Sequence, residues 1–292
     1  MKILITGGAG YVGSSLIQEL CNNNQIISID DYSVGLESNH IDHINVTYIK
    51  KHSKNVNRDF ILENSIELIY HLGEYSRIAP SFKDIETVFD SNIVGSFNII
   101  KLCSELNIPL VYSASSTKFA TEGVNHSPYS YFKGFSVELV KNYGKWFNLN
   151  YSICYFYNVY GSDTKTAWNT QNYQNVIDVF KHQKSLNLPL TVTGDGSQTR
   201  DFTHVRDIVN GLILSSKQLK NKEYFLGTGI EYSILDIAKL FNHPIEYIEA
   251  RPGDRKNSEL PVNDTQKELK WIPQYNVEQY IKEVIYENIN IK

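Results

Sequence analysis

Short apolar runs alternate with longer segments of helical spacing through the first half of the chain. The runs are continuous and rich in β-branched residues, which is typical of strands buried on both faces of a parallel sheet. Between them, apolar residues recur with helical spacing, notably over Val88–Leu106 and Phe132–Trp146. The predicted strands are Lys2–Thr6, Ile26–Asp30, Val46–Lys50, Glu67–Leu72, Pro109–Ser113 and Tyr151–Phe156.

This alternation predicts an α/β protein with a Rossmann-like, doubly wound parallel sheet. After about Gly161 the pattern loosens, and short strands such as Leu190–Thr193 and Tyr224–Gly227 mix with helices. We expect residues 1–160 to form the dinucleotide-binding domain. Residues 161–292 are expected to form mainly a smaller α/β substrate lobe over the strand ends, with some segments returning to the main domain.

Composition and charge restrict the class of protein. The 292 residues are 41% apolar and 21% charged, with a net charge of −4 and a pI of about 6.1. Neither a basic stripe nor a run of eighteen apolar residues is present, so we expect no nucleic-acid partner and no membrane span. The first strand starts at Lys2 and leaves no room for a signal peptide. Cys21, Cys103 and Cys154 are scattered, which indicates reduced thiols and a cytoplasmic protein.

Neither the eight histidines nor the three cysteines have the spacing of a zinc site, so no metal is expected. His204, in the stretch "FTHVRD", is interpreted as a structural histidine.

A glycine-rich turn follows the first predicted strand directly. Gly7, Gly10 and Gly13 form G-x-x-G-x-x-G in "TGGAGYVGSSL", and a helix is expected to begin near Tyr11. Glycine lets the backbone approach a pyrophosphate closely, and a helix N-terminus offers free N–H groups to it. The alternative is a turn that only packs the helix on the strand.

Two acidic residues end the second predicted strand. Asp30 is placed to accept hydrogen bonds from the adenosine ribose hydroxyls of a bound dinucleotide. Asp30 and Asp31 would repel a 2′-phosphate, and no arginine stands nearby to bind one. The predicted cofactor is therefore NAD rather than NADP.

A possible catalytic set lies in "VYSASSTKFA" and "PYSYFK". Ser115 is at the end of the fifth predicted strand, where doubly wound sheets place their chemistry. Tyr129 and Lys133 are four residues apart and share a helix face. A tyrosine with a pKa of about 10 is a poor base at neutral pH, and a nearby ammonium favours its phenolate. The alternative is a surface Tyr–Lys pair beside a serine loop.

The motifs along the chain together resemble one family. In order they are "TGGAGYVGS", "YHLGEYSRIAPSF", "NIVGSFNII", "VYSASST", "PYSYFK", "YNVYG", "GDGSQTRDFTHVRDI", "FLGTGIEYSILDIA" and "RPGD". This ordered set resembles the extended short-chain dehydrogenase/reductases, especially the nucleotide-sugar epimerases, over nearly the whole chain.

The resemblance implies roles for individual residues. Ser115, Tyr129 and Lys133 would form the catalytic triad, and Asn92 would support the active-site backbone. Arg200 and Arg251 would hold the substrate diphosphate, and Asp254 would bind the nucleoside sugar or order Arg251. The implied cofactor-binding residues are Gly7, Gly10, Tyr11, Val12, Gly13, Asp30, Asp31, Leu72, Gly73, Asn92, Tyr129 and Lys133. The implied substrate-binding residues are Arg77, Ser115, Ser116, Thr117, Asn158, Asn175, Arg200, Arg251 and Asp254.

The chain departs from the family pattern at several points. The acidic segment that follows the third strand and contacts adenine is replaced by "IKKHSKN". Where the family has Ala-Ala or Ala-Gly, this chain has Gly73-Glu74, and Glu74 lies beside the cofactor phosphates or turns away from them. Arg77 takes the place of varied polar residues that face the sugar. The stretch from Ser115 to Tyr129 is shorter than usual, which trims a loop over the pocket.

The serine strand separates reaction types within the family. Dehydratases carry Thr-Asp-Glu at the positions of Ser115, Ser116 and Thr117, and decarboxylating relatives carry a glutamate at the position of Thr117. Without those acids, the preferred function is an NAD-dependent nucleotide-sugar 4-epimerase with a 4-keto intermediate. A nucleotide-sugar oxidoreductase, either a 4-dehydrogenase or a ketoreductase, is the alternative. A non-catalytic dinucleotide-binding protein is the third reading, against which the intact triad argues.

The helices Val88–Leu106 and Phe132–Trp146 are apolar on more than one face. In the family the equivalent pair forms a four-helix bundle between two subunits, so a homodimer is expected. The alternative is packing against the sheet alone, which uses only one face of each helix.

Overall fold

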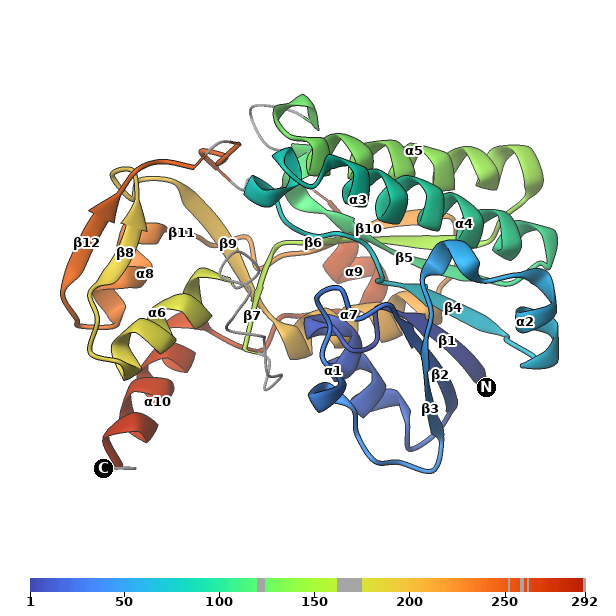
Figure 1. The fold of residues 1–292 in the computed structure, drawn as a ribbon, viewed down its shortest axis with the longest axis horizontal. Helices are drawn as coiled ribbons and strands as arrows, with labels where there is room; N and C mark the ends of the chain where they lie inside the picture. The colour runs from blue at the N-terminus through green and yellow to red at the C-terminus, as the bar shows by residue number, and fades with distance from the viewer. Residues whose placement is uncertain (120–123, 162–174, 252, 258–259, 262, 291–292) are drawn as a thin grey trace.

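A seven-stranded parallel sheet forms the centre of the main domain (Figure 1). The computed structural model describes residues 1–119, 124–161, 175–251, 253–257, 260–261 and 263–290. The strands lie in the order β10-β6-β5-β4-β1-β2-β3. Their bounds are β1 Lys2–Thr6, β2 Gln25–Asp30, β3 Val46–Lys50, β4 Leu68–His71, β5 Leu110–Ser115, β6 Tyr151–Phe156 and β10 Lys222–Leu226. Helices cover both faces, so the predicted Rossmann-like α/β fold is confirmed.

The position of β10 in the main sheet corrects one expectation. We assigned Tyr224–Gly227 to the smaller lobe, but β10 pairs in parallel with β6 in the main sheet, with Tyr224 opposite Cys154. Tyr224 and Leu226 are buried in the core beneath this sheet. The apolar pattern identified the strand, but it carried no information about which sheet the strand joins.

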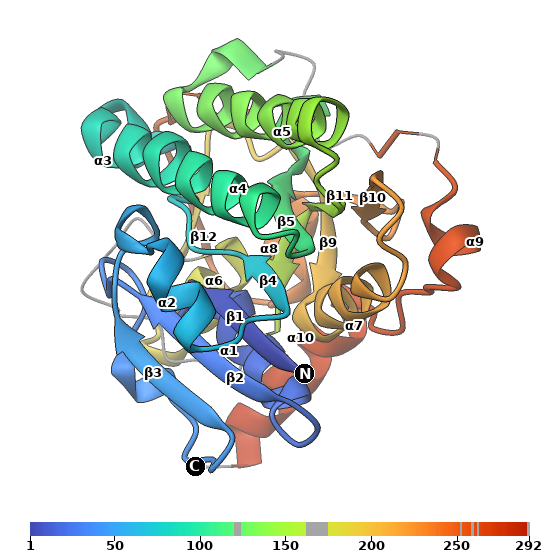
Figure 2. The same cartoon turned by 90° about the vertical axis from the view of Figure 1, so that its right-hand side faces the viewer.

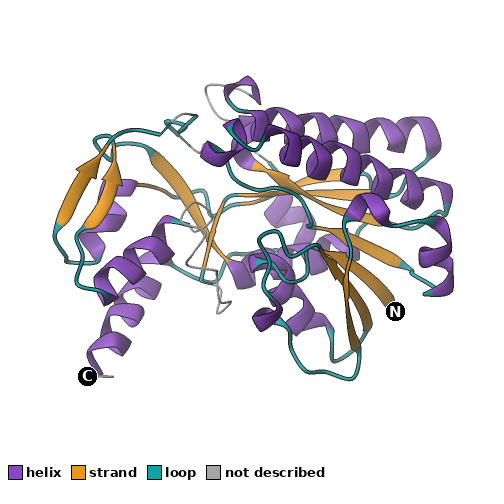
Figure 3. Cartoon of the chain, viewed as in Figure 1, coloured by secondary structure: helices purple, strands orange, loops and turns teal. Residues whose placement is uncertain are grey.

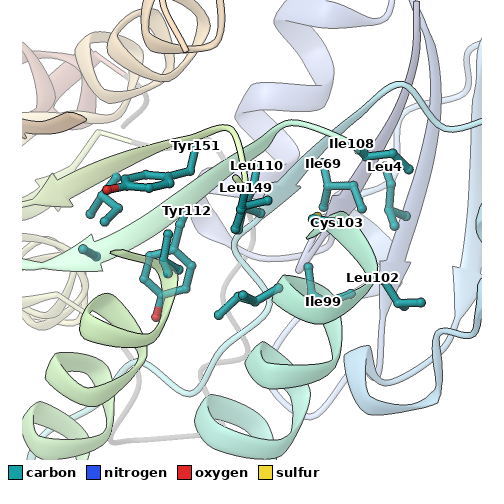
Figure 4. Close-up of a cluster of buried hydrophobic side chains, with 14 of the residues drawn as sticks. Leu4, Ile69, Ile99, Leu102, Cys103, Ile108, Leu110, Tyr112, Leu149 and Tyr151 are labelled. Atoms are coloured by element: carbon teal, nitrogen blue, oxygen red, sulfur yellow. The ribbon is translucent and has the colours of Figure 1, made fainter. Parts of the chain in front are cut away.

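Two layers of helices enclose the sheet. Helices α1 (Tyr11–Leu20) and α7 (Val205–Ser216) pack on one face. The other face is covered by α2 (Arg58–Glu63), α4 (Ser96–Glu105) and α5 (Pro128–Phe147). Figure 4 shows the apolar core of this second face, where side chains of β1, β4, β5 and β6 meet those of α4.

The predicted helix Val88–Leu106 is not one continuous α-helix. Helix α3 (Ile85–Phe89) is followed by a π-helical turn, Asp90–Gly95, before α4 begins at Ser96. A π turn adds a residue to the local repeat and is frequently found at functional sites. Here the turn carries Asn92, which is buried.

A smaller lobe stands at one end of the sheet, on the left of Figure 1, and Figure 3 shows its separate short strands and helices. One small sheet pairs β8 (Leu190–Thr193) with β12 (Ile245–Ile248), and another has the order β11-β9-β7. The remaining lobe elements are β7 Asn158–Tyr160, β9 Thr199–His204, β11 Glu231–Ser233, α6 Val176–Ser185, α8 Ile234–Leu240 and α10 Val277–Asn290. These elements share their own apolar core.

Residues late in the chain also complete the main domain. Helix α9 (Thr265–Leu269) and Trp271 join the core of the α1–α7 face, and Figure 2 shows α7 and α9 on the same side of the molecule. We therefore keep the division near residue 160 as a proposal, with β10, α7 and α9 as returning segments. None of the helices in the described part of the chain is long and apolar enough to cross a membrane.

Candidate active site

A cavity of about 550 Å³ lies where the carboxyl ends of the central strands meet the smaller lobe. The strand order reverses between β1 and β4, and open α/β sheets bind ligands at such a switch point. Every residue that we expected to bind or to react lines this cavity, with the exception of Asn92. The site is therefore assembled from both halves of the chain.

The glycine turn brings the backbone close to the cavity. Gly7 has a φ of +71°, and a Cβ there would lie 2.7 Å from Cα of Gly73. A Cβ at Gly13 would lie 2.1 Å from the carbonyl oxygen of Gly7. The turn thus packs the start of α1 tightly on the strand, and it also exposes the N-terminal turn of α1 to the cavity at Gly10 and Tyr11. Both effects suit a pyrophosphate at this point.

Asp30 has the placement that the ribose of NAD needs. Its side chain lies at the carboxyl end of β2, lines the cavity and is held by the backbone N–H groups of Ala9 (3.0 Å) and Tyr32 (2.9 Å). Burial raises the pKa of Asp30 from its ordinary value. Two donors leave lone pairs on both oxygens for further hydrogen bonds. The residues present therefore fit NAD at this end of the cavity.

The segment that replaces the family's acidic residues also reaches the cavity. Lys51, His52 and Ser53 line it. Nε2 of His52 lies 3.9 Å from Oδ2 of Asp31, and Oδ1 of Asp31 accepts hydrogen bonds from Ser33. The segment after β3 thus brings a lysine, a histidine and a serine to this end of the cavity.

Helix α5 positions the predicted base and lysine. Its N-cap Ser127 accepts a hydrogen bond from the N–H of Ser130, and Pro128 occupies the first turn. Tyr129 and Lys133 are both buried on successive turns of this helix and both line the cavity. Ser115, at the end of β5, lines the same cavity and accepts a hydrogen bond from the Thr117 hydroxyl at 3.1 Å.

The side chain of Glu74 is buried in the interior of the protein. Its carboxylate forms an ion pair with the Lys133 ammonium, and the side chains of Glu74 and Lys133 are 1% and 6% exposed. Lys133 also donates to the carbonyl oxygen of Ser113 at 2.6 Å. Glu74 accepts further hydrogen bonds from Ser96 (2.6 Å) and Tyr112 (2.8 Å). The predicted catalytic lysine is therefore already neutralised by a carboxylate of the chain.

A buried histidine extends this network beneath the site. Nδ1 of His71 lies 2.7 Å from the Thr6 hydroxyl, and Nε2 lies 3.0 Å from the Ser96 hydroxyl. Because Ser96 donates its proton to Glu74, Nε2 of His71 is the donor to Ser96. The Thr6 hydroxyl oxygen accepts from the N–H groups of Leu72 and Gly73, so its own proton is left to donate to Nδ1, as a neutral His71 requires. Burial lowers the pKa of His71 to about 4, against a smaller opposing effect of Glu74.

Asn92 supports the backbone and does not contact the cavity. Its amide nitrogen donates to the carbonyl oxygen of Tyr75 (2.9 Å), and its amide oxygen accepts from the N–H of Tyr75 (2.7 Å). The side chain is fully buried, so our inclusion of Asn92 among the direct cofactor contacts is corrected. The π turn is what directs Asn92 inward.

The arginines of the lobe are arranged differently from our expectation. Asp254 pairs with Arg200 at 2.5 Å, so the arginine that it orders is Arg200 rather than Arg251. Arg200 also donates to the backbone oxygen of Arg255 at 2.8 Å. Arg251 is exposed and lines the cavity.

The remaining predicted substrate residues lie on the same walls. Arg77 follows the turn after β4, and Asn158 begins β7. Asn175 caps α6, and its amide donates to the Tyr11 hydroxyl at 3.2 Å, which joins the lobe to the glycine turn. Residues 120–123 of the shortened loop between Ser115 and Tyr129 lie outside the described residues.

Sequence reasoning missed Arg255, a buried arginine of the cavity wall. Its only signal in the sequence is a cation directly after "RPGD". His204 caps α7 and stacks on Tyr275 at 4.1 Å, a structural position. Among the described residues, no group of three or more His, Cys, Asp or Glu side chains could hold a metal ion.

The chain is similar to known proteins over most of its length. The profile of the NAD dependent epimerase/dehydratase family matches residues 3–227. A Methanocaldococcus jannaschii protein provisionally named UDP-glucose 4-epimerase is 26% identical over 310 residues, covering 97% of each chain. The structure of UDP-glucose 4-epimerase with UDP-glucose from Thermotoga maritima is similar over 100% of both chains (TM-score 0.88, 22% identity). Another similar structure is UDP-glucuronic acid 4-epimerase from Bacillus cereus with UDP-glucuronic acid and NAD (TM-score 0.86, 22% identity, 100% of both chains).

Proposed function

Since the chain belongs to the NAD dependent epimerase/dehydratase family, we propose that it is a nucleotide-sugar 4-epimerase that works through a 4-keto intermediate. Its cofactor is NAD. The observation that carries the proposal is the meeting of Ser115, Tyr129 and Lys133 in one cavity with the glycine turn and the arginines of the lobe.

The residues of the chain supply binding and proton transfer. NAD, when bound, would supply hydride-transfer chemistry at C4 of the sugar. Tyr129 and Ser115 both line the cavity. Tyr129 would take the proton of the 4-hydroxyl group, and Ser115 would hold the same oxygen by a hydrogen bond. Arg200 and Arg251 are candidates for the diphosphate because a guanidinium matches phosphate oxygens in shape and charge. Epimerisation requires the keto sugar to turn about this anchor and present its other face.

The end of β5 favours epimerisation over elimination or decarboxylation. Ser115, Ser116 and Thr117 bring only hydroxyl groups to the cavity at this point. Water elimination needs a general acid and a general base in addition to the tyrosine. The carboxylate of Glu74, which also lines the cavity, is paired with Lys133 and has 1% side-chain exposure. It is therefore not available to protonate a leaving group.

The test is product analysis without added reductant. The purified protein would be incubated with UDP-, GDP- and dTDP-hexoses, and the products would be followed by NMR. We expect a C4 epimer from at least one of them with no net change in NADH absorbance. A released 4-keto sugar, or a stoichiometric requirement for cofactor, would move the assignment to a nucleotide-sugar 4-dehydrogenase or ketoreductase.

We also propose that two copies associate through α3, α4 and α5. The outer surface of this layer exposes large apolar side chains, and the layer lies on the outside of the molecule in Figure 1. Many large apolar side chains exposed on one helical layer are typical of an interface. The exposed residues on or beside these helices are Phe82, Ile85, Phe89, Val94, Phe97, Tyr131, Phe135, Trp146 and Phe147.

The three cysteines are all free and buried, which supports a cytoplasmic location as a further proposal.

A further inference from the structure

Arg255 lies in the wall of the active-site cavity, next to the predicted catalytic serine. Its side chain donates from Nη1 to the Ser116 hydroxyl at 3.1 Å and from Nη2 to Oδ1 of Asn158 at 3.0 Å. The guanidinium is thus fixed between the end of β5 and the start of β7, and the residue is 5% exposed. Ser116 and Asn158, which we expected to contact substrate, hold this arginine in place.

The two hydrogen-bond partners of Arg255 are neutral. Within the described part of the chain, no carboxylate lies within ion-pair distance of it. The other two buried cations of the cavity wall are paired, Lys133 with Glu74 and Arg200 with Asp254. Burial lowers the pKa of Arg255 to about 10, with a further contribution from Arg200, so it remains charged at neutral pH. Asp254 and two tyrosines act against this decrease, but none of them forms an ion pair with Arg255. A buried charge without a direct ion pair is costly, which indicates that an anion completes this site.

The position of Arg255 indicates where on the substrate the anionic group would lie. Ser116 follows Ser115, which by the proposed function holds the oxygen on C4. In a hexopyranose, C1 bears the diphosphate and lies across the ring from C4. The groups next to C4 are those on C3 and on C5, and C5 carries C6. We therefore assign a guanidinium bound to Ser116 to the C3–C6 edge of the sugar.

We propose that Arg255 binds a carboxylate at C6, so that the substrate is a nucleoside-diphosphate hexuronic acid. This inference rests on the proposed function, because it uses the placement of C4 at Ser115. A carboxylate presents two oxygens in a plane, and a guanidinium can donate to both. Arg255 makes its two hydrogen bonds to the protein through Nη1 and Nη2, and a guanidinium carries five N–H donors in all.

Binding measurements test the inference separately from catalysis. The NAD-loaded Tyr129→Phe variant would be titrated calorimetrically with UDP-glucuronic acid and with UDP-glucose, which differ only at C6. We expect UDP-glucuronic acid to bind at least about tenfold more tightly, the effect of one charge-assisted hydrogen bond. Equal affinity for the two, or tighter binding of UDP-glucose, would overturn the proposal without any change to Arg255.

Three further variants in the same background test whether Arg255 causes the preference for UDP-glucuronic acid. Arg255→Gln keeps hydrogen-bonding capacity and removes the charge, so it should abolish the preference, whereas Arg255→Lys should restore part of it. Arg251→Ala should weaken both ligands by the same factor, because it is assigned to the diphosphate that they share. A preference that survives Arg255→Gln in a protein with unchanged UDP affinity contradicts the proposal.

Failure of the role proposed for Arg255 can be distinguished from failure of the proposed epimerase function. A preference for UDP-glucuronic acid that depends on Arg255, without formation of a C4 epimer by the unaltered protein, supports the hexuronic acid substrate and rejects the epimerase. Rapid C4 epimerisation of UDP-glucose with no preference for the uronic acid supports the epimerase and rejects the role of Arg255.

Discussion

The carboxylate of Glu74 is paired in the interior of the protein with the ammonium of Lys133, which lies one turn of α5 beyond Tyr129. The two residues are 59 positions apart, and the pair joins the turn after β4 to helix α5. Since Ser96 and Tyr112 also donate to Glu74, this carboxylate holds together β5, α4 and α5 behind the cavity.

Removal of this carboxylate should destabilise the fold. Glu74→Gln leaves Lys133 as a buried cation without a countercharge, and breaking a buried pair in this way costs about 3–5 kcal/mol. The free energy of unfolding from urea titration measures the loss. Glu105→Gln is the matched control, because its pair with Lys101 is exposed on α4 and contributes at most about 1 kcal/mol. Equal effects of the two substitutions would contradict a structural role for the Glu74–Lys133 pair.

Tyr129 should be essential for turnover and dispensable for folding. Tyr129→Phe keeps the ring and removes the phenol, so the rate should fall by about 10²–10⁴-fold while the melting temperature changes little. Steady-state rates with the preferred nucleotide sugar provide the measurement. Tyr131→Phe, two residues further on the exposed side of α5, should retain full activity. A Tyr129→Phe variant that keeps most of its activity would remove the proposed base.

The cofactor preference should depend on Asp30. The unaltered protein should bind NAD much more tightly than NADP, because a 2′-phosphate would meet the carboxylates of Asp30 and Asp31. Asp30→Asn removes a charge at similar size, so it should narrow the difference between the two cofactors. Isothermal titration after removal of any bound nucleotide is the measurement, and equal or tighter binding of NADP by the unaltered protein would rule out this assignment.

His71 should make stability depend on pH. Its pKa is about 4 in the folded protein and 6.5 ordinarily, so between these values the unfolded chain binds more protons. The contribution of neutral His71 is therefore complete above pH 6.5 and is lost as the pH falls towards 4. Between pH 7.5 and pH 5 the loss is about 2 kcal/mol, at 1.36 kcal/mol per pH unit below 6.5.

Other buried acids also titrate in this range, so the variant His71→Asn serves as the reference. The difference in unfolding free energy between the unaltered protein and His71→Asn should shrink by about 2 kcal/mol from pH 7.5 to pH 5. A difference that does not change with pH would show that His71 is not a buried neutral histidine.

The apolar surface of α3, α4 and α5 should hold two copies together. Phe97→Asp and Phe135→Asp place charges in this surface and should shift the protein from dimer to monomer in analytical ultracentrifugation. Tyr247→Asp is the control, since Tyr247 is 57% exposed on β12 in the smaller lobe and should leave the assembly unchanged. A monomeric unaltered protein would reject the proposed interface.

The strands that depend only on a short stretch of sequence were predicted well. The bounds of β1, β3 and β6 coincide with the predicted runs, because each is a short apolar segment with turns on both sides. The helix over Val88–Leu106 was predicted as continuous, since a π turn leaves no mark on apolar spacing. The placement of β10 beside β6 depends on a pairing 70 residues apart along the chain, between Lys222 and Ser152.

The candidate site also contains residues that a local motif predicts and contacts that no local motif predicts. Gly7, Asp30 and Tyr129 were identified because their motifs have fixed spacing relative to strands and helices. The pairing of Glu74 with Lys133 and the burial of Arg255 could not be predicted, because both depend on which side chains meet across the folded chain. The position of Glu74 was conspicuous in the sequence, but its direction was undetermined.

The return of the chain to the main sheet has a consequence for synthesis on the ribosome. The flank of β6 stays an unpaired strand edge until residues 222–226 have emerged to form β10. Open edges readily pair with other chains. The nascent protein therefore cannot complete its first domain and then its second in sequence. A fragment that ends near residue 160 should accordingly be prone to self-association, since the strand that closes its sheet is made more than 60 residues later.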